Sequence, residues 1–225
     1  MQPKETDFVI ADFSVRVQGG SLVETTRAQE AKDAGIFKDD VTYRPSLVML
    51  PDMNLMKGFK AALLGAAVDE EKTVSIGKED GFGERDESLV RIIPLSKFKE
   101  SGMNPEQGML VTIDNYNGRV QSISSGRVRV DFNHDLAGKN LEYKFKILSV
   151  LGDAPGKLSG ILDEFLEAGK AAKMSSGVAE VVIGPEVVSK NRDYLSKKVM
   201  AIESILLYIP EVTKLLWTEE FVPKR

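Results

Sequence analysis

The sequence of 225 residues contains no cysteine, one histidine and one tryptophan. The absence of cysteine excludes disulfides and thiolate nucleophiles or ligands, and a single histidine excludes a metal cage built from several imidazoles. We therefore expect no metal or other cofactor. The longest apolar run without glycine, Ile205 to Ile209, is much shorter than the roughly 20 residues that span a bilayer. We expect neither a signal peptide nor a membrane segment, and the expected location is the cytosol.

Charged side chains make up 28% of the sequence and are spread along it, with a net charge of −4. No basic block of the kind that follows nucleic-acid phosphates is present, so neither nucleic acid nor a membrane is an expected partner. Apolar residues make up 42% of the chain. At this length they can fill the core of one large domain or of two to three small ones, which predicts a soluble globular protein.

The first part of the chain has strand patterns interrupted by two helical segments. Val9 to Val17 alternates apolar and polar residues, and Gly19-Gly20 turns the chain back into Leu22 to Thr25 as a hairpin partner. Thr26 and Gln29 have the spacing of a capping box, which predicts a short helix ending near Gly35. Strands are predicted at 47–50 and 72–76. Between them we predict a helix capped by Asn54, carrying Leu55, Met56, Phe59, Ala62 and Leu63, and ended by Gly65.

Residues 86–130 have a pattern of their own. Helical turns are predicted at 89–92 and 96–99, followed by a three-stranded meander with strands at 109–113, 120–123 and 128–130. Asn117-Gly118 is a strong signal for a hairpin turn. A segment of this size can form a small satellite domain stabilised partly by its attachment. Its two ends should lie close together, because insertions are tolerated where the parent chain would make a surface loop.

The last third begins with Gly152-Asp153-Ala154-Pro155-Gly156, which has the composition of a linker. The patterns that follow predict a helix at 157–168, a strand at 178–183, a long helix from Pro185 to about Tyr208 and a strand at 213–221. Each helix has an apolar stripe, and two strands are too few to cover both. This predicts a homodimer through residues 157–225.

Two motifs flank the 86–130 segment. Gly81-Phe82-Gly83-Glu84-Arg85-Asp86 precedes it, and Asn133-His134-Asp135-Leu136-Ala137-Gly138 follows it and leads into the alternating strand from Leu141 to Ile147. This ordered pair, an aromatic-Gly-x-x-Asp motif and an Asn-His-x-Leu-Ala-Gly motif around a second domain, resembles the SlyD-like branch of the FKBP-type peptidyl-prolyl cis-trans isomerases. The layout of the last third is similar to the C-terminal domain of long-chain archaeal members.

The resemblance implies an α+β protein with three domains. An FKBP-like curved antiparallel sheet with a crossing helix is expected from residues 1–85 and 131–151. An inserted small α+β domain of the IF type is expected at 86–130, and a C-terminal α/β domain at 152–225. The implied function is peptidyl-prolyl cis-trans isomerisation with chaperone activity on unfolded or partly folded proteins. The alternative is a non-catalytic holdase or assembly chaperone that retains the FKBP fold.

Prolyl isomerisation requires twisting of a C–N bond against a barrier of roughly 18–20 kcal/mol, and it needs no nucleophile. An apolar pocket that removes water and selects the twisted geometry can suffice. The resemblance implies that this pocket is formed by Phe13, Glu24, Met56, Phe59, Phe82, Leu141 and Tyr143. In the inserted domain, an apolar surface that could bind unfolded chains is predicted at Phe98, Met103, Met109, Leu110 and Ile113.

Three pocket positions depart from the family pattern. Phe82 stands where most members have a tyrosine whose hydroxyl bonds the substrate carbonyl, Phe59 where many have tryptophan, and Glu24 where aspartate is usual. We expect catalysis to persist with weaker binding of macrolide inhibitors.

Each of these roles has a simpler alternative. The pocket aromatics and the apolar residues of the inserted domain also fit ordinary core packing, and Glu24 fits a solvated hairpin charge. His134 could act as a general base or metal ligand, but we interpret it as structural, bonding the backbone of its own turn. The end of the chain, Glu219 to Arg225, lacks the His/Cys-rich tail of many SlyD proteins, so no nickel role is expected.

Overall fold

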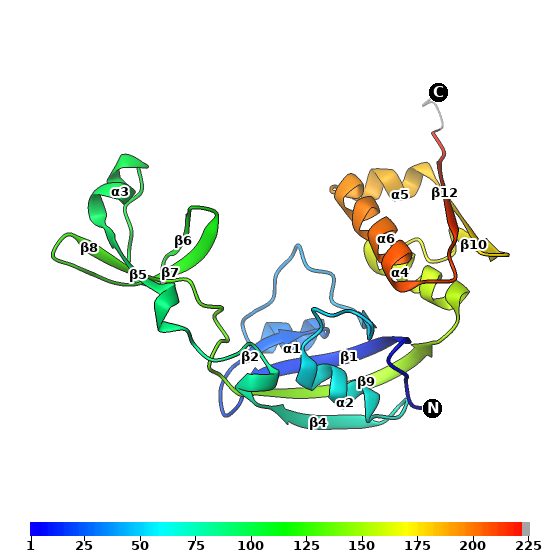
Figure 1. The fold of residues 1–225 in the computed structure, drawn as a ribbon, viewed down its shortest axis with the longest axis horizontal. Helices are drawn as coiled ribbons and strands as arrows, with labels where there is room; N and C mark the ends of the chain where they lie inside the picture. Colours follow the sequence, from blue (N-terminus) through cyan, green and yellow to red (C-terminus); the bar gives the residue numbers. More distant parts are fainter. Residues whose placement is uncertain (222–225) are drawn as a thin grey trace. The chain divides into compact units, whose positions relative to one another are not determined.

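The computed structural model describes residues 1–221. The chain forms two compact units, one made of residues 1–76 together with the chain from residue 141 onward, the other made of residues 77–140. Each unit has its own sheet or sheets, coloured along the sequence in Figure 1. In the part of the chain that the structure describes, no helix is long and apolar enough to cross a membrane.

The first unit contains a five-stranded antiparallel sheet. Its strands are β1 (Phe8–Val17), β2 (Leu22–Thr25), β3 (Ser46–Met49), β4 (Glu71–Ile76) and β9 (Leu141–Leu151). β1 pairs with β9 along its whole length, while its other edge pairs with β3 through its first half and with β2 through its second half. Phe13 and Val15 are directly opposite Phe145 and Tyr143, so the four side chains point to one face of the sheet.

Helix α2 (Lys57–Leu64) lies across this sheet (Figure 1). Phe59 of α2 packs its ring against Phe13, Tyr143 and Phe145, with ring centroids 5.5, 4.6 and 5.7 Å apart. Edge-to-face and offset contacts at these distances are the arrangements that aromatic rings prefer. The predicted α+β fold, an antiparallel sheet crossed by a helix, is confirmed.

The predicted capping box at the short helix α1 (Ala28–Asp33) is wrong. The hydroxyl of Thr26 is used by the sheet instead, because it accepts a hydrogen bond from the Phe13 N–H at 3.0 Å and donates one to the carboxylate of Asp12. Gln29 donates to Asp33 one turn further along, at 2.8 Å. The helix therefore begins without a side-chain cap.

The predicted Asn54 cap of α2 is also wrong, since the helix starts at Lys57. Asp52 forms a turn ahead of the helix: its carboxylate accepts a hydrogen bond from the Asn54 N–H at 2.9 Å, and its carbonyl accepts one from the Leu55 N–H at 3.3 Å. Leu55 and Met56 consequently lie in the loop before α2. Gly65 follows the helix at its C-terminal cap, as predicted.

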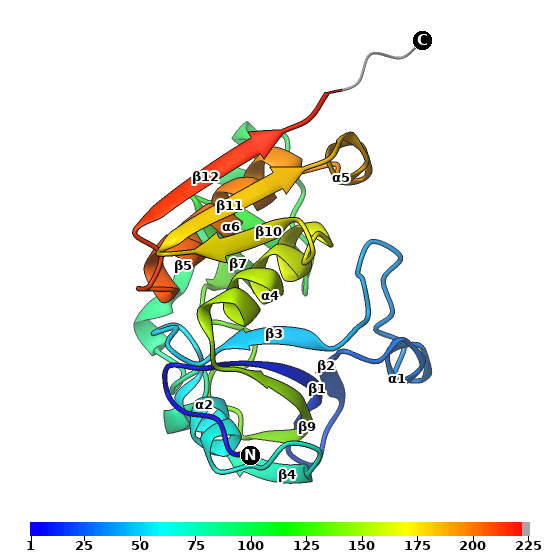
Figure 2. The same cartoon turned by 90° about the vertical axis from the view of Figure 1, so that its right-hand side faces the viewer.

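The first unit also contains a three-stranded sheet near the C-terminus, shown in Figure 2. Its strands are β10 (Ala172–Ser175), β11 (Val178–Ile183) and β12 (Lys214–Glu219); β11 lies in the centre, antiparallel to β10 and parallel to β12. The parallel pair requires a crossover, which is made by α5 (Pro185–Lys190) and α6 (Tyr194–Tyr208). Helix α4 (Ala154–Leu166), α6 and the sheet share one core, and Phe8 of β1 belongs to it.

Residues 152–156 do not form a linker. The carboxylate of Asp153 accepts a hydrogen bond from the Gly156 N–H at 3.0 Å and caps α4, which begins at Ala154 with Pro155 in its first turn. A linker-like composition was compatible with this start because aspartate and proline are also the residues that favour helix N-termini.

The predicted single helix from Pro185 to Tyr208 is two helices. Asn191 leaves the helical conformation, with φ −95° and ψ 103°. Its side-chain amide donates to the carbonyl of Val187 at 2.9 Å, which satisfies one of the last carbonyls of α5. Strand β10 is absent from the prediction; its hairpin with β11 turns at Ser176 and Gly177, both with positive φ.

The second unit contains a four-stranded antiparallel sheet in the order β5-β8-β7-β6. Its elements are η1 (Lys78–Asp80), η2 (Glu87–Leu89), β5 (Val90–Pro94), α3 (Leu95–Glu100), β6 (Leu110–Ile113), β7 (Tyr116–Ser124) and β8 (Arg127–Asp131). Its core consists of Ile93, Phe98, Val111, Val120, Val128 and Val130. Strand β5 therefore adds a fourth strand to the predicted three-stranded meander. The helical turn predicted at 89–92 is wrong, because Val90, Ile92 and Ile93 are β-branched and belong to β5, which pairs with β8.

The predicted hairpin turn at Asn117-Gly118 is wrong as well. The turn between β6 and β7 is made by Asp114 and Asn115, which have φ of 51° and 66°. Gly118 lies within β7, where a Cβ atom would be 2.7 Å from a Val130 side-chain carbon. Glycine is therefore required at this position because the side chains inside the sheet leave no room for a Cβ atom, and it does not form a turn.

Candidate active site

A pocket of about 260 Å³ lies beside α2 in the first unit. Its walls come from β1, β2, β3, the loop before α2, α2 itself and β9. The lining residues are Phe13, Glu24, Ser46, Leu47, Val48, Met49, Asp52, Leu55, Met56, Phe59 and Tyr143. Most of them are apolar, as expected for a cavity that binds an uncharged group and excludes water.

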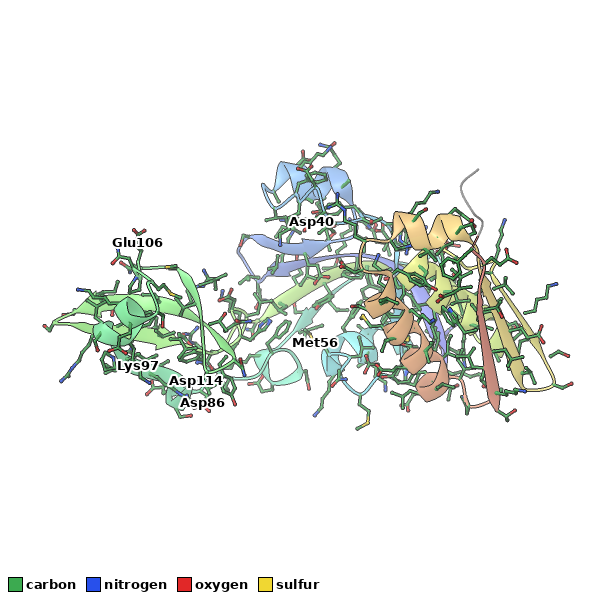
Figure 3. All side chains as sticks on the ribbon, turned by 90° about the horizontal axis from the view of Figure 1, so that it is seen from above. Asp40, Met56, Asp86, Lys97, Glu106 and Asp114 are labelled. Carbon is green, nitrogen blue, oxygen red and sulfur yellow. The ribbon has the colours of Figure 1, made fainter. Side chains whose placement is uncertain are left out.

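The structure brings together five of the predicted pocket residues, namely Phe13, Glu24, Met56, Phe59 and Tyr143. Met56, labelled in Figure 3, reaches the pocket from the loop before α2. The other two predicted residues do not line it. Leu141 has no exposed surface and is part of the core, while Phe82 belongs to the second unit.

The polar atoms of the pocket have distinct environments. Burial raises the pKa of Tyr143 to about 12, with a smaller contribution from the charge of Glu24, so its hydroxyl stays protonated at physiological pH. Burial also raises the pKa of Glu24. In the described part of the chain the Tyr143 hydroxyl has no hydrogen-bond partner, and it can therefore donate to a bound carbonyl.

The wall formed by Ser46 to Met49, with Asp52 and Leu55, is missing from the sequence-based prediction. The strand at 47–50 is predicted, but its position beside the pocket depends on its pairing with the first half of β1. No local pattern contains that long-range pairing. Asp52 lines the pocket from the turn before α2, and Leu55, which the prediction placed inside the helix, belongs to the same turn.

A larger depression of about 900 Å³ lies along α4 and the start of α5. Among the residues that the structure describes, no aromatic ring lines it, and its walls carry charges of both signs, from Asp163, Glu167, Glu186, Glu220, Lys170 and Lys190. A depression with such walls would keep an amide hydrated. The smaller aromatic pocket is therefore the better candidate for chemistry on a planar peptide group.

In the second unit, a groove of about 300 Å³ includes three of the predicted client-binding residues, Phe98, Met103 and Ile113. Phe98 is 3% exposed and belongs to the core of the unit, and the other two pack against that core. Lys97 and Asp114, labelled in Figure 3, also line the groove. The remaining two predicted residues are on the surface: Met109 is 37% exposed and Leu110 is 64% exposed.

Side-chain contacts connect the two points at which the chain enters and leaves the β-sheet part of the second unit. The Asn133 side chain accepts a hydrogen bond from the Asp86 N–H at 2.8 Å and donates one to the Asp86 carbonyl at 2.9 Å. Arg85 forms an ion pair with the buried carboxylate of Asp131. These contacts confirm the prediction that the ends of the inserted segment lie close together.

His134 bonds the backbone of its own turn, as predicted. Its Nδ1 accepts a hydrogen bond from the Leu136 N–H at 3.2 Å within the turn, and its ring stacks on Phe82 with centroids 4.0 Å apart. Within residues 1–221, no group of three His, Cys, Asp or Glu side chains could hold a metal ion. The tail at 222–225, part of the segment in which we predict no metal ligands, lies outside the described residues.

The chain is similar in sequence to several known proteins. Residues 91–136 match the family model described as FKBP26, IF domain. The chain is 34% identical over 147 residues to a short-type peptidyl-prolyl cis-trans isomerase of Methanocaldococcus jannaschii, an alignment that covers 65% of this chain and 93% of that protein. It is 31% identical over 147 residues to a probable FKBP-type 16 kDa peptidyl-prolyl cis-trans isomerase of Pseudomonas fluorescens, covering 63% and 87% respectively.

A SlyD protein of Helicobacter pylori, named an FKBP-type peptidyl-prolyl cis-trans isomerase, is 28% identical over 144 residues, which cover 62% of this chain and 70% of that protein. The chain therefore belongs to the FKBP-type peptidyl-prolyl cis-trans isomerases. The resemblance to SlyD-like members and the presence of an IF-type domain are confirmed.

Proposed function

We propose that this chain catalyses the cis-trans isomerisation of X-Pro bonds in unfolded or partly folded proteins, at the pocket beside α2. The observation that carries the proposal is the convergence of Phe13, Met56, Phe59 and Tyr143 on one small pocket in a member of this family. A proline ring would pack against this aromatic wall, and the Tyr143 hydroxyl would donate a hydrogen bond to the preceding carbonyl.

The pocket would act without proton transfer or a covalent intermediate. Moving the imide out of water disfavours its charge-separated planar form, and a wall built for the twisted form binds the transition state more strongly than the ground state. The buried aromatic cluster around Phe59 supplies a rigid wall. The Tyr143 hydroxyl would replace the donor that Phe82 lacks, since it is neutral over the whole physiological range.

Protease-coupled turnover of a proline tetrapeptide tests this proposal. The chain should shorten the uncatalysed time of tens to hundreds of seconds by a large factor. Met56→Ala should reduce kcat/KM by roughly tenfold, about 1.4 kcal/mol of transition-state stabilisation. The matched control is Met53→Ala, three residues earlier in the same loop, because Met53 is 96% exposed and does not line the pocket. No acceleration by the wild-type chain would leave the non-catalytic chaperone as the better reading.

We also propose that the second unit captures unfolded clients. Its groove beside Phe98 and the exposed side chains of Ile92 (65%) and Leu110 (64%) support this, since exposed apolar surface on a small domain commonly marks an interaction site. We propose the domain division 1–85 with 131–151, 86–130, and 152–225 as the functional one. The cytosolic location and an archaeal source remain predictions.

Replacing residues 86–130 with a short Gly-Ser loop tests the division of labour. Tetrapeptide turnover should change little, because a four-residue substrate occupies only the pocket. Refolding of a proline-limited protein should slow strongly, since a captured chain meets the pocket at an effective concentration that can reach roughly millimolar. Equal losses in both assays would mean that the insertion is part of the active site. Full refolding activity after the deletion would mean that it captures no client.

A homodimer through the C-terminal part is a further proposal. Helix α6 exposes a row of apolar side chains: Leu195 is 73% exposed, Val199 52%, Met200 50%, Leu206 56% and Leu207 70%. A second copy could cover this row, as isologous contacts commonly do in twofold dimers.

A further inference from the structure

Within residues 1–221, the edge of β3 that faces away from β1 has no strand partner, because β3 pairs with β1 and lies off the main path of the sheet. Glu164 of helix α4 fills this position. One carboxylate oxygen accepts a hydrogen bond from the Ser46 hydroxyl at 2.9 Å, and the other accepts one from the Leu47 N–H at 3.1 Å. Hydrogen bonds to a carboxylate are stronger than neutral ones.

Arg44, two residues before β3, makes a second link to the same helix. Its guanidinium forms an ion pair with Asp163 at 2.9 Å and donates to the main-chain carbonyls of Asp163 and Glu164 at 2.8 and 3.1 Å. These carbonyls belong to the last turn of α4, where the helix dipole favours a cation, and the Asp163 carbonyl also accepts the Glu167 N–H at 2.9 Å. The start of β3 is thus fixed to α4 by side-chain contacts from both sides.

The other end of the segment is held by helix α6. The Tyr208 hydroxyl donates a hydrogen bond to the Asp52 carboxylate at 3.1 Å. Burial raises the pKa of Tyr208, and this hydrogen bond adds to the effect. The Asp52 N–H in turn donates to the carbonyl of Met49, the last residue of β3, at 3.1 Å. Two helices near the C-terminus therefore bracket one short segment of the isomerase sheet.

That segment is a wall of the proposed active site, since Ser46, Leu47, Val48, Met49 and Asp52 all line the pocket. We propose that Glu164 and Tyr208 are positioning residues for prolyl isomerisation, which makes the C-terminal part of the chain a component of the isomerase pocket. This inference rests on the proposed function. A four-residue edge strand without these contacts would open locally, and substrate binding would then have to order it.

The free-energy cost of ordering this wall determines how the kinetic constants should change. If the wall is ordered in only a fraction of molecules, the apparent affinity falls by that fraction while the bound complex reacts normally. Glu164→Ala should therefore raise KM for a proline tetrapeptide about fivefold, equivalent to about 1 kcal/mol, with kcat within about twofold of the wild type. A variant that was merely less folded would lose kcat through the smaller active fraction and keep its KM.

Two companion variants make the test specific. Glu164→Gln keeps one carboxamide oxygen that can accept from Leu47 or Ser46, and it should recover most of the wild-type KM. Glu203→Ala removes the same side chain from an exposed position on α6, and it should leave KM unchanged. Tyr208→Phe should raise KM by a smaller factor, because it releases only the Asp52 end.

Amide hydrogen exchange at Leu47 gives a readout independent of catalysis. Exchange should accelerate in Glu164→Ala, while the amides of the central strand β9 keep their wild-type rates. If folded Glu164→Ala keeps the wild-type turnover, KM and Leu47 exchange rate, the positioning role is wrong but the proposed function stands. A fall in kcat at constant KM would also overturn the positioning role. Absence of turnover in the wild-type chain would instead refute the proposed function itself.

Discussion

Tyr143→Phe removes one hydroxyl from the pocket and leaves the aromatic wall in place. The ring keeps its stacking against Phe59, whose centroid is 4.6 Å away, so the core beneath the pocket should not change. A net neutral hydrogen bond contributes about 0.5–1.5 kcal/mol. If the hydroxyl donates to the substrate carbonyl in the transition state, kcat/KM for a proline tetrapeptide should fall by a factor of about 2 to 12.

The pH dependence provides an internal check on this effect. Because the pKa of Tyr143 is about 12, the hydroxyl is protonated from neutral pH to about pH 10, and the ratio of wild-type to variant activity should be constant over that interval. The larger change Tyr143→Ala should cost at least tenfold, or about 1.4 kcal/mol, but it also removes a buried ring.

Protease-coupled turnover measures both variants, and far-UV circular dichroism with a thermal melt establishes that they fold. Tyr116→Phe is the matched control, because Tyr116 is 62% exposed and lies in the other unit. A folded Tyr143→Phe protein with wild-type kcat/KM would show that the hydroxyl contacts no part of the substrate. A folded Tyr143→Ala protein with full activity would place the active site elsewhere.

Three further predictions concern stability, client capture and assembly. Unfolded tyrosine loses its proton near pH 10, whereas Tyr143 and Tyr194 keep theirs to about pH 12, so the free energy of unfolding should fall between pH 10 and 12 by about 1.4 kcal/mol per pKa unit for each residue. Urea titrations should show a flatter decline in the double phenylalanine variant; an equally steep decline would contradict the assignment. Leu110→Ser should weaken suppression of aggregation without affecting tetrapeptide turnover. The control Val182→Ser, on the C-terminal sheet, should leave both activities unchanged. If Leu110→Ser suppresses aggregation as well as the wild type does, this side chain is not part of the capture surface. Light scattering should report a dimer that Leu207→Glu dissociates, and a constant mass of 24.8 kDa at all concentrations would refute the dimer.

The sequence predicted those parts of the fold that local periodicity encodes. The alternation from Val9 to Val17 and from Leu141 to Ile147 marks two neighbouring strands, because each buries one face against α2 and the core. The two motifs around the inserted segment also carry local information. The Asn133 side chain connects the two ends of the inserted segment, and His134 accepts a hydrogen bond within its own turn. The pocket residues on β1, α2 and β9 followed from the family resemblance.

Predicted turns and caps failed where a residue had a tertiary role that competed with its local preference. Thr26 has the chemistry of a helix cap, but its hydroxyl is bonded to β1. Gly118 follows an asparagine as in a hairpin turn, yet it is needed where Val130 approaches the strand too closely for any Cβ atom. In both cases the competing partner is distant in sequence, so that no local pattern reports it.

Tertiary structure alone decided one wall of the pocket. The wall from Ser46 to Asp52 is placed by pairing with β1 and by contacts with Glu164 and Tyr208, more than one hundred residues further along the chain. Sequence determined which segments could form strands and helices, because burial on one face imposes a period on the residues. Which segments meet is set by the burial and hydrogen bonding of whole elements, and those interactions exist only once the chain has folded.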